Sequence, residues 1–143
     1  MTYVMSDIHG CYDKYQSMLA AIHFAADDTL YVLGDVLDRG PDGFRILLDL
    51  AVRPNVTGLL GNHELLAAAV LPSLLRTMRQ GEDQFLTPAE RKLMEEWLQN
   101  GGKSSILQFL QLSDEETEVV CAYLNALSPW KEVTVQGRKF VLV

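Results

Sequence analysis

The first sixty residues alternate between short apolar runs and longer stretches in which apolar side chains recur at helical spacing. The apolar runs are typical of buried strands, and they lie at 2–5, 30–33 and 56–60. Between the first two runs, the pattern over 11–24 predicts a helix with one packed face. A second helix is expected over 41–53, where an Arg-Pro-Asn sequence stops it. Strands that alternate with helices predict an α/β fold with a parallel sheet.

The pattern changes after Glu64, and residues 65–127 are predicted to be helical throughout. The expected helices cover 65–78, 88–99, 104–111 and 114–127. Capping boxes begin at Thr87 and at Ser113, each with a glutamate three residues later. Because this block contains no strand pattern, we interpret it as a helical insertion, or lid, within a single domain that covers residues 1–143.

The last stretch, Trp130–Val143, is predicted to form a β-hairpin that turns at Gln136-Gly137. It ends on Phe140–Val143, four apolar residues typical of a strand that is buried on both faces. Nothing else in the sequence can cover such a strand. We therefore expect either a domain that is truncated at its C-terminal side, or a homodimer formed through the exposed sheet.

Composition narrows the class of protein. The chain has 143 residues, 48% of them apolar, and a formal net charge of −7. An acidic chain without a basic run is not expected to bind nucleic acid or an anionic membrane. Cys11 and Cys121 match no zinc spacing, and neither a signal peptide nor an apolar run of about 18 residues is present. We therefore expect a cytoplasmic protein.

Polar clusters follow each of the three predicted strands. They begin at Asp7, Asp35 and Asn62, and the spacings between these residues are 28 and 27 positions. One strand, one crossover helix and two loops need about 30 residues, so the clusters fall at equivalent points of successive units. Parallel strands carry their carboxyl ends to one edge of the sheet. The clusters are therefore expected to converge there.

The side chains of these clusters suit metal chemistry. Asp7, His9 and Asp35 offer two carboxylates and an imidazole, and Asp35 with Asn62 offers a second group of oxygen donors. If the carboxylate of Asp35 bridges two metal ions, these residues form two adjacent metal positions. Their mixed oxygen and nitrogen donors suit Mn²⁺, Fe, Zn²⁺ or Co²⁺. Two such ions clamp a phosphoryl group and activate water.

Three further side chains complete the hypothesis. Arg39 has the planar guanidinium that binds phosphate oxygens in pairs. His63 is the candidate general acid for the leaving oxygen, and Asp38 is the candidate group that fixes its tautomer.

These motifs resemble those of the calcineurin-like metallophosphoesterases, and more narrowly the phosphoprotein phosphatase branch. The resemblance rests on Asp7-x-His9-Gly10, Gly34-Asp35-x-x-Asp38-Arg39-Gly40, Gly61-Asn62-His63-Glu64 and Trp97-Leu98-Gln99-Asn100-Gly101-Gly102. The last segment is similar to one in bacterial and phage serine/threonine phosphatases and in symmetrical diadenosine tetraphosphatases. The resemblance implies a βαβ-type metallophosphoesterase sandwich, here partial, with metal ligation, phosphate binding and acid catalysis by the residues named above.

One departure affects the expected function. The family completes its second metal position with two further histidines, whereas this sequence holds only His9, His23 and His63. His23 is expected at the surface, so the second position has only Asp35 and Asn62. We expect a metal-dependent phosphoesterase, with serine/threonine protein phosphatase as the main prediction and a phosphoprotein as substrate. The alternatives are hydrolysis of a dinucleoside tetraphosphate, and a truncated metal-binding fragment without turnover.

Overall fold

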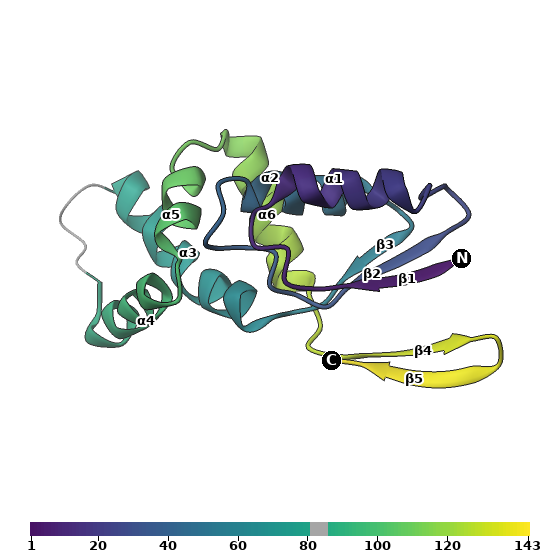
Figure 1. Ribbon diagram of the computed structural model, residues 1–143. Coiled ribbons are helices and arrows are strands. Elements are labelled where there is room, and N and C mark those ends of the chain that lie inside the picture. Colours follow the sequence, from purple (N-terminus) through teal and green to yellow (C-terminus); the bar gives the residue numbers. More distant parts are fainter. Residues whose placement is uncertain (81–85) are drawn as a thin grey trace.

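A computed structural model of the protein describes residues 1–80 and 86–143, and it contains a parallel sheet with helices packed against it (Figure 1). The sheet has the order β1-β2-β3, with β1 (Thr2–Met5), β2 (Thr29–Val32) and β3 (Val56–Gly58). Consecutive parallel strands need crossovers of one hand, which place the connecting helices over the same face. Those helices are α1 (Tyr12–Ala21) and α2 (Gly43–Val52). The predicted α/β architecture is confirmed.

The core lies between the sheet and these helices. Leu30 and Val32 of β2 are fully buried, as expected for the central strand of three. They pack with Tyr15 of α1 and with Ile46 and Leu47 of α2. This packing anchors the strand whose carboxyl end carries the residues Gly34–Gly40.

The helical block contains α3 (Asn62–Gln80), α4 (Pro88–Gln99), α5 (Lys103–Phe109) and α6 (Asp114–Ala126). Both predicted capping boxes are present, at Thr87 and at Ser113, and the predicted bounds of α4 are those observed. Helix α3 begins at Asn62, three residues earlier than expected, so the predicted site residues Asn62 and His63 are its first two residues. A short part of the predicted 65–127 insertion, residues 81–85, lies outside the described residues.

The C-terminal hairpin consists of β4 (Lys131–Val135) and β5 (Arg138–Leu142), which pair in antiparallel register. Its turn has positive φ at Gln136 (50°) and at Gly137 (77°), the backbone that a two-residue hairpin turn requires. The predicted hairpin and its turn are therefore confirmed.

The expectation that nothing else in the sequence covers Phe140–Val143 agrees with the structure, in which Phe140, Val141 and Val143 are exposed. Within the part of the chain that the structure describes, β5 pairs only with β4, so one edge and one face remain uncovered. Val141 is 62% exposed and Val143 is 78% exposed. Figure 1 shows the hairpin apart from the sheet, on the face opposite to α1 and α2. Side chains of β4 and β5 face Val4 and Tyr31 across a hollow of about 190 Å³.

Candidate active site

The loops that follow the three strands meet at one edge of the sheet, as the spacing predicted. The amide of His9 donates to the carbonyl of Asp35 at 3.0 Å, and the amide of Gly40 donates to the carbonyl of His9 at 3.1 Å. The third loop approaches equally closely, since a Cβ on Gly61 would lie 2.4 Å from Asp35 Oδ1. Only glycine allows this approach.

Five of the predicted site residues have a left-handed backbone. The φ angles are 56° at Asp7, 43° at His9, 54° at Asp35, 71° at Asp38 and 65° at Arg39. Non-glycine residues adopt this region at a cost of about 1–3 kcal/mol each, and they cluster at functional sites. The hydrogen bonds between the loops hold this strained backbone in place.

The innermost group of side chains consists of His9, Asp35 and His63. Their ligand atoms all lie within 4.8 Å of one another. His9 Nδ1 lies 2.8 Å from the carbonyl oxygen of Leu37. A carbonyl only accepts, so Nδ1 carries the proton and Nε2 presents a lone pair to the site.

Two atoms of this group are buried without a hydrogen-bond partner among the described residues: His9 Nε2 and Asp35 Oδ1. An unpaired buried acceptor costs about 1–3 kcal/mol, which few native structures tolerate without a reason. An imidazole nitrogen beside a carboxylate oxygen is a donor pair for a divalent transition metal. The residues present therefore fit the metal that the sequence motifs imply.

Glu64 holds the loop that carries Asp35. Its side chain is fully buried. Oε1 accepts from the amides of Val36 (2.9 Å) and Leu37 (3.0 Å), and Oε2 accepts from those of Asp35 (2.7 Å) and Gly61 (3.2 Å). Burial raises the pKa of Glu64, although the backbone donors oppose the rise. One carboxylate thus ties the second loop to the third.

Asp38 is also fully buried, and it holds His63. Its Oδ2 lies 2.6 Å from His63 Nδ1. Trp97 Nε1 donates to both carboxylate oxygens, at 3.0 and 2.9 Å, and Ser105 Oγ donates to Oδ1 at 2.6 Å. The Asp38–His63 contact was predicted from the sequence, whereas the two donors from α4 and α5 were not.

The remaining predicted residues lie at the surface of this site. Asp7 is exposed and accepts from Ser6 Oγ at 2.6 Å, and it does not belong to the group of three. Asn62 is exposed at the first position of α3, and the Arg39 side chain is exposed. The amide of Arg39 donates to the carbonyl of Gly101 at 3.2 Å, so the α4–α5 turn adjoins the loop after β2.

Sequence reasoning missed three positioning residues, namely Glu64, Trp97 and Ser105. Glu64 had a local signal, because an acid in the first turn of an apolar helix is commonly read as a cap. The fully buried side chain of Glu64 also accepts hydrogen bonds from the loop after β2, and a role as a helix cap does not predict those contacts. Trp97 and Ser105 lie 59 and 67 positions from Asp38. Trp97 belongs to the Trp97–Gly102 motif, but neither residue carries a local signal for a contact with Asp38.

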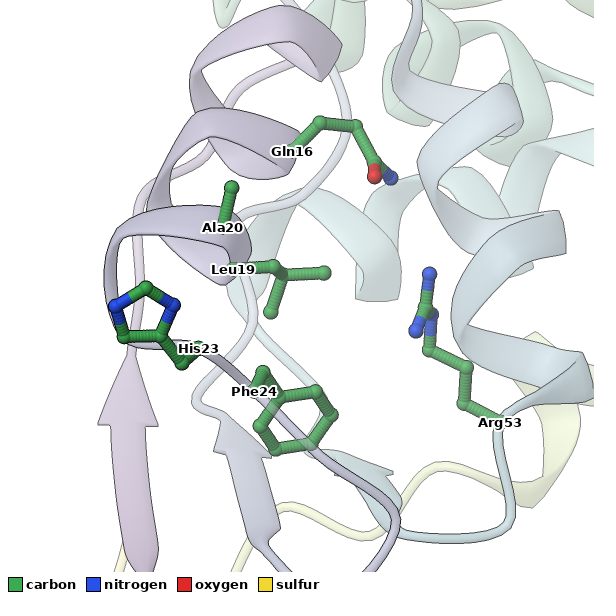
Figure 2. Close-up of a pocket in the computed structure, with 6 residues that line it drawn as sticks. All are labelled: Gln16, Leu19, Ala20, His23, Phe24 and Arg53. Atoms are coloured by element: carbon green, nitrogen blue, oxygen red, sulfur yellow. The ribbon is translucent and has the colours of Figure 1, made fainter.

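A separate hollow of about 470 Å³ lies between α1 and the end of α2 (Figure 2). It is lined by Gln16, Leu19, Ala20, His23, Phe24 and Arg53. Arg53 pairs with Asp49 through Nε at 2.7 Å and Nη2 at 3.1 Å, so its charge is already balanced. His23 is exposed just after the end of α1, and its surface position agrees with the prediction. This hollow contains none of the predicted site residues.

A parallel α/β sheet with an unpaired imidazole–carboxylate pair at its carboxyl edge, beside a histidine held by aspartate, is typical of metal-dependent hydrolases. Residues 2–140 match the calcineurin-like phosphoesterase family, and the chain belongs to it. The predicted family and enzyme class are therefore confirmed. Among the described residues, no helix is long and apolar enough to cross a membrane.

Three curated relatives share one name. A symmetrical bis(5'-nucleosyl)-tetraphosphatase of Acidovorax sp. is 39% identical over an alignment of 151 positions, gaps included, which covers 96% of this chain and 52% of that protein. The protein of that name from Klebsiella pneumoniae is 31% identical over 137 residues, covering 94% of this chain and 46% of the relative. A third protein of that name, from Wigglesworthia glossinidia brevipalpis, is 27% identical over 131 residues, covering 90% of this chain and 46% of the relative. The chain thus spans about half the length of the curated relatives it matches.

These relatives correct the main functional prediction. They are named tetraphosphatases and not protein phosphatases, so serine/threonine protein phosphatase was the wrong choice. The motifs that motivated it were interpreted as metal-binding and phosphate-binding motifs, which both activities need. Such motifs identify the chemistry and not the substrate.

Proposed function

We propose that this chain forms the metal-binding part of a phosphoesterase that hydrolyses dinucleoside tetraphosphates. The observation that carries the proposal is the pair of buried, unpaired atoms, His9 Nε2 and Asp35 Oδ1, beside His63. The name shared by the curated relatives supports the substrate class.

The metal ligands of this proposal come from all three loops. His9 and Asp35 hold the first ion together with Asp7, and Asp35 and Asn62 contribute to a second position. Mn²⁺ is the proposed metal, and Fe, Zn²⁺ and Co²⁺ suit the same mixture of nitrogen and oxygen donors. When bound, such ions supply positive charge that polarises a phosphoryl group and makes water nucleophilic at neutral pH.

The remaining residues act on the substrate directly. The exposed guanidinium of Arg39 binds non-bridging phosphate oxygens through its planar fork. His63, when both of its ring nitrogens are protonated, donates the Nε2 proton to the leaving oxygen, while Asp38 accepts from Nδ1–H and keeps the ring oriented. The acidic net charge of −7 repels a polyphosphate at long range, so binding depends on Arg39 and on metal.

The test is hydrolysis of diadenosine tetraphosphate, followed by chromatography of the nucleotide products with and without Mn²⁺. It uses this chain and, where the gene encodes a longer product, that product as well. Symmetrical cleavage gives ADP alone, whereas asymmetrical cleavage gives ATP and AMP. Asp35→Asn should abolish turnover. Asp27→Asn, which removes an exposed carboxylate in the turn before β2, should leave it unchanged. Metal-independent turnover, or full activity in Asp35→Asn, contradicts the proposal.

A second candidate is metal binding without turnover. It is favoured by the histidine count of three, because the second metal position then has only Asp35 and Asn62. Calorimetry combined with the hydrolysis assay separates the two candidates. One tight site per chain together with no hydrolysis supports this candidate, whereas ADP formation by the isolated chain excludes it.

A further inference from the structure

The α4–α5 segment reaches the proposed acid through hydrogen bonds to Asp38. The carboxylate of Asp38 is fully buried and makes contacts through both of its oxygens. Oδ2 contacts His63 Nδ1 and Trp97 Nε1, and Oδ1 contacts Trp97 Nε1 and Ser105 Oγ. Because the carboxylate is buried, each of these contacts needs one group that donates a hydrogen and one that accepts it.

The directions of the two hydrogen bonds made by Ser105 Oγ can be assigned uniquely. The backbone amide of Asp38 donates to Ser105 Oγ at 2.9 Å, and an amide N–H cannot accept. The hydroxyl therefore accepts from that amide, and its own hydrogen is directed to Asp38 Oδ1, 2.6 Å away. Ser105 is thus a donor toward the carboxylate.

The same reasoning applies to Trp97. The indole Nε1–H donates and has no lone pair to accept with. It lies 3.0 Å from Oδ1 and 2.9 Å from Oδ2, and the whole side chain is buried. A Cβ on Gly102 would lie 2.6 Å from the indole ring, so the glycine lets the backbone pack directly against it.

We propose that Trp97 and Ser105 are positioning residues that set the tautomer of His63. Since Trp97 and Ser105 both donate to it, the carboxylate of Asp38 acts as an acceptor, and His63 Nδ1 must supply the hydrogen of the 2.6 Å contact. Nε2 is then the nitrogen left to face the reacting oxygen, and it acts as the acid when it carries the second proton of the ring. The role in turnover rests on the proposed function, whereas the tautomer itself can be observed without substrate.

The first experiment measures the tautomer directly. Nitrogen-15 NMR of the metal-free protein at neutral pH should find His63 protonated at Nδ1, with a downfield Nδ1–H resonance. Ser105→Ala and Trp97→Phe should broaden or shift that resonance, and Ser105→Thr, which keeps the hydroxyl, should restore it. Trp130→Phe alters the other tryptophan, which is exposed, and should change nothing. A wild-type His63 that is protonated at Nε2 and bare at Nδ1 overturns the proposal without any variant.

The second experiment measures the kinetic consequence. Phenyl phosphate has a poor leaving group and needs the acid, whereas p-nitrophenyl phosphate leaves readily and needs it less. Ser105→Ala and Trp97→Phe should lower kcat on phenyl phosphate about ten- to hundredfold, with a smaller loss on the nitrophenyl ester and an unchanged KM. Equal losses on both esters overturn the proposal. If the wild-type protein hydrolyses no phosphate ester or anhydride, the proposed function fails, and the NMR result still decides the role of Trp97 and Ser105.

Discussion

Replacing Glu64 with glutamine tests whether one carboxylate holds the site together. The two side chains have the same shape, but glutamine offers one acceptor oxygen in place of two. Each oxygen of Glu64 now accepts from two backbone amides, at distances between 2.7 and 3.2 Å. Whichever way the new amide is oriented, its NH₂ group faces two N–H donors and leaves both unpaired.

The magnitude follows from the cost of those two donors. An unsatisfied buried polar group costs about 1–3 kcal/mol, so two cost about 2–6 kcal/mol. Removing a buried charge offsets part of this loss, because burial raises the pKa of Glu64 and so opposes its ionised form. We expect the free energy of unfolding to fall by about 2–4 kcal/mol, a large share of the 5–15 kcal/mol typical of a domain.

Urea denaturation measures this change as a lower midpoint with an unchanged m-value. Calorimetry with Mn²⁺ should also show weaker binding, since Asp35 lies on the loop that Glu64 holds. The matched control is Glu95→Gln, an exposed glutamate on α4, which should stay within about 0.5 kcal/mol of wild type. A loss below about 1 kcal/mol in Glu64→Gln, or metal affinity equal to wild type, refutes the reasoning.

Four further predictions concern other parts of the molecule. His63→Ala should reduce kcat more on phenyl phosphate than on p-nitrophenyl phosphate, and equal losses would remove His63 from the acid role. Calorimetry with Mn²⁺ should find about one tight site per chain, and two sites of equal affinity would contradict this. Hydrogen bonds from Ser73, the Thr87 amide and Arg76 lower the pKa of Glu90 from its ordinary 4.5 to about 2. The stabilisation from these bonds is therefore present above pH 4.5 and is lost as the pH falls toward 2. Glu90→Gln should therefore lower the Tm at pH 7 and approach wild type near pH 2, whereas a Tm difference independent of pH argues against this. Sedimentation at micromolar concentration should show the isolated chain as a dimer or larger through the exposed β5 edge, and a compact, cooperatively melting monomer would refute this.

The sequence by itself determined the features that depend on neighbouring residues. The capping box at Thr87 and the proline after it set the start of α4, because these groups satisfy amides within one turn. Gln136-Gly137 set the hairpin turn, since its backbone needs positive φ. The nearly equal spacing of Asp7, Asp35 and Asn62 predicted the convergence of three loops, because each βα unit of this length returns the chain to the same edge of a parallel sheet.

Only the tertiary structure decided which groups support the site and which remain uncovered. Glu64 reaches the amide of Asp35 across 29 positions, and Ser105 reaches Asp38 across 67, distances at which local pattern carries no information. Conversely, the apolar residues of Phe140–Val143 looked like a buried strand, yet Val141 is 62% exposed. An apolar sequence shows that burial of its side chains would be favourable. Those side chains are buried only if another part of the structure packs against them. The buried acceptors at His9 and Asp35 were likewise visible only once the loops had closed around them.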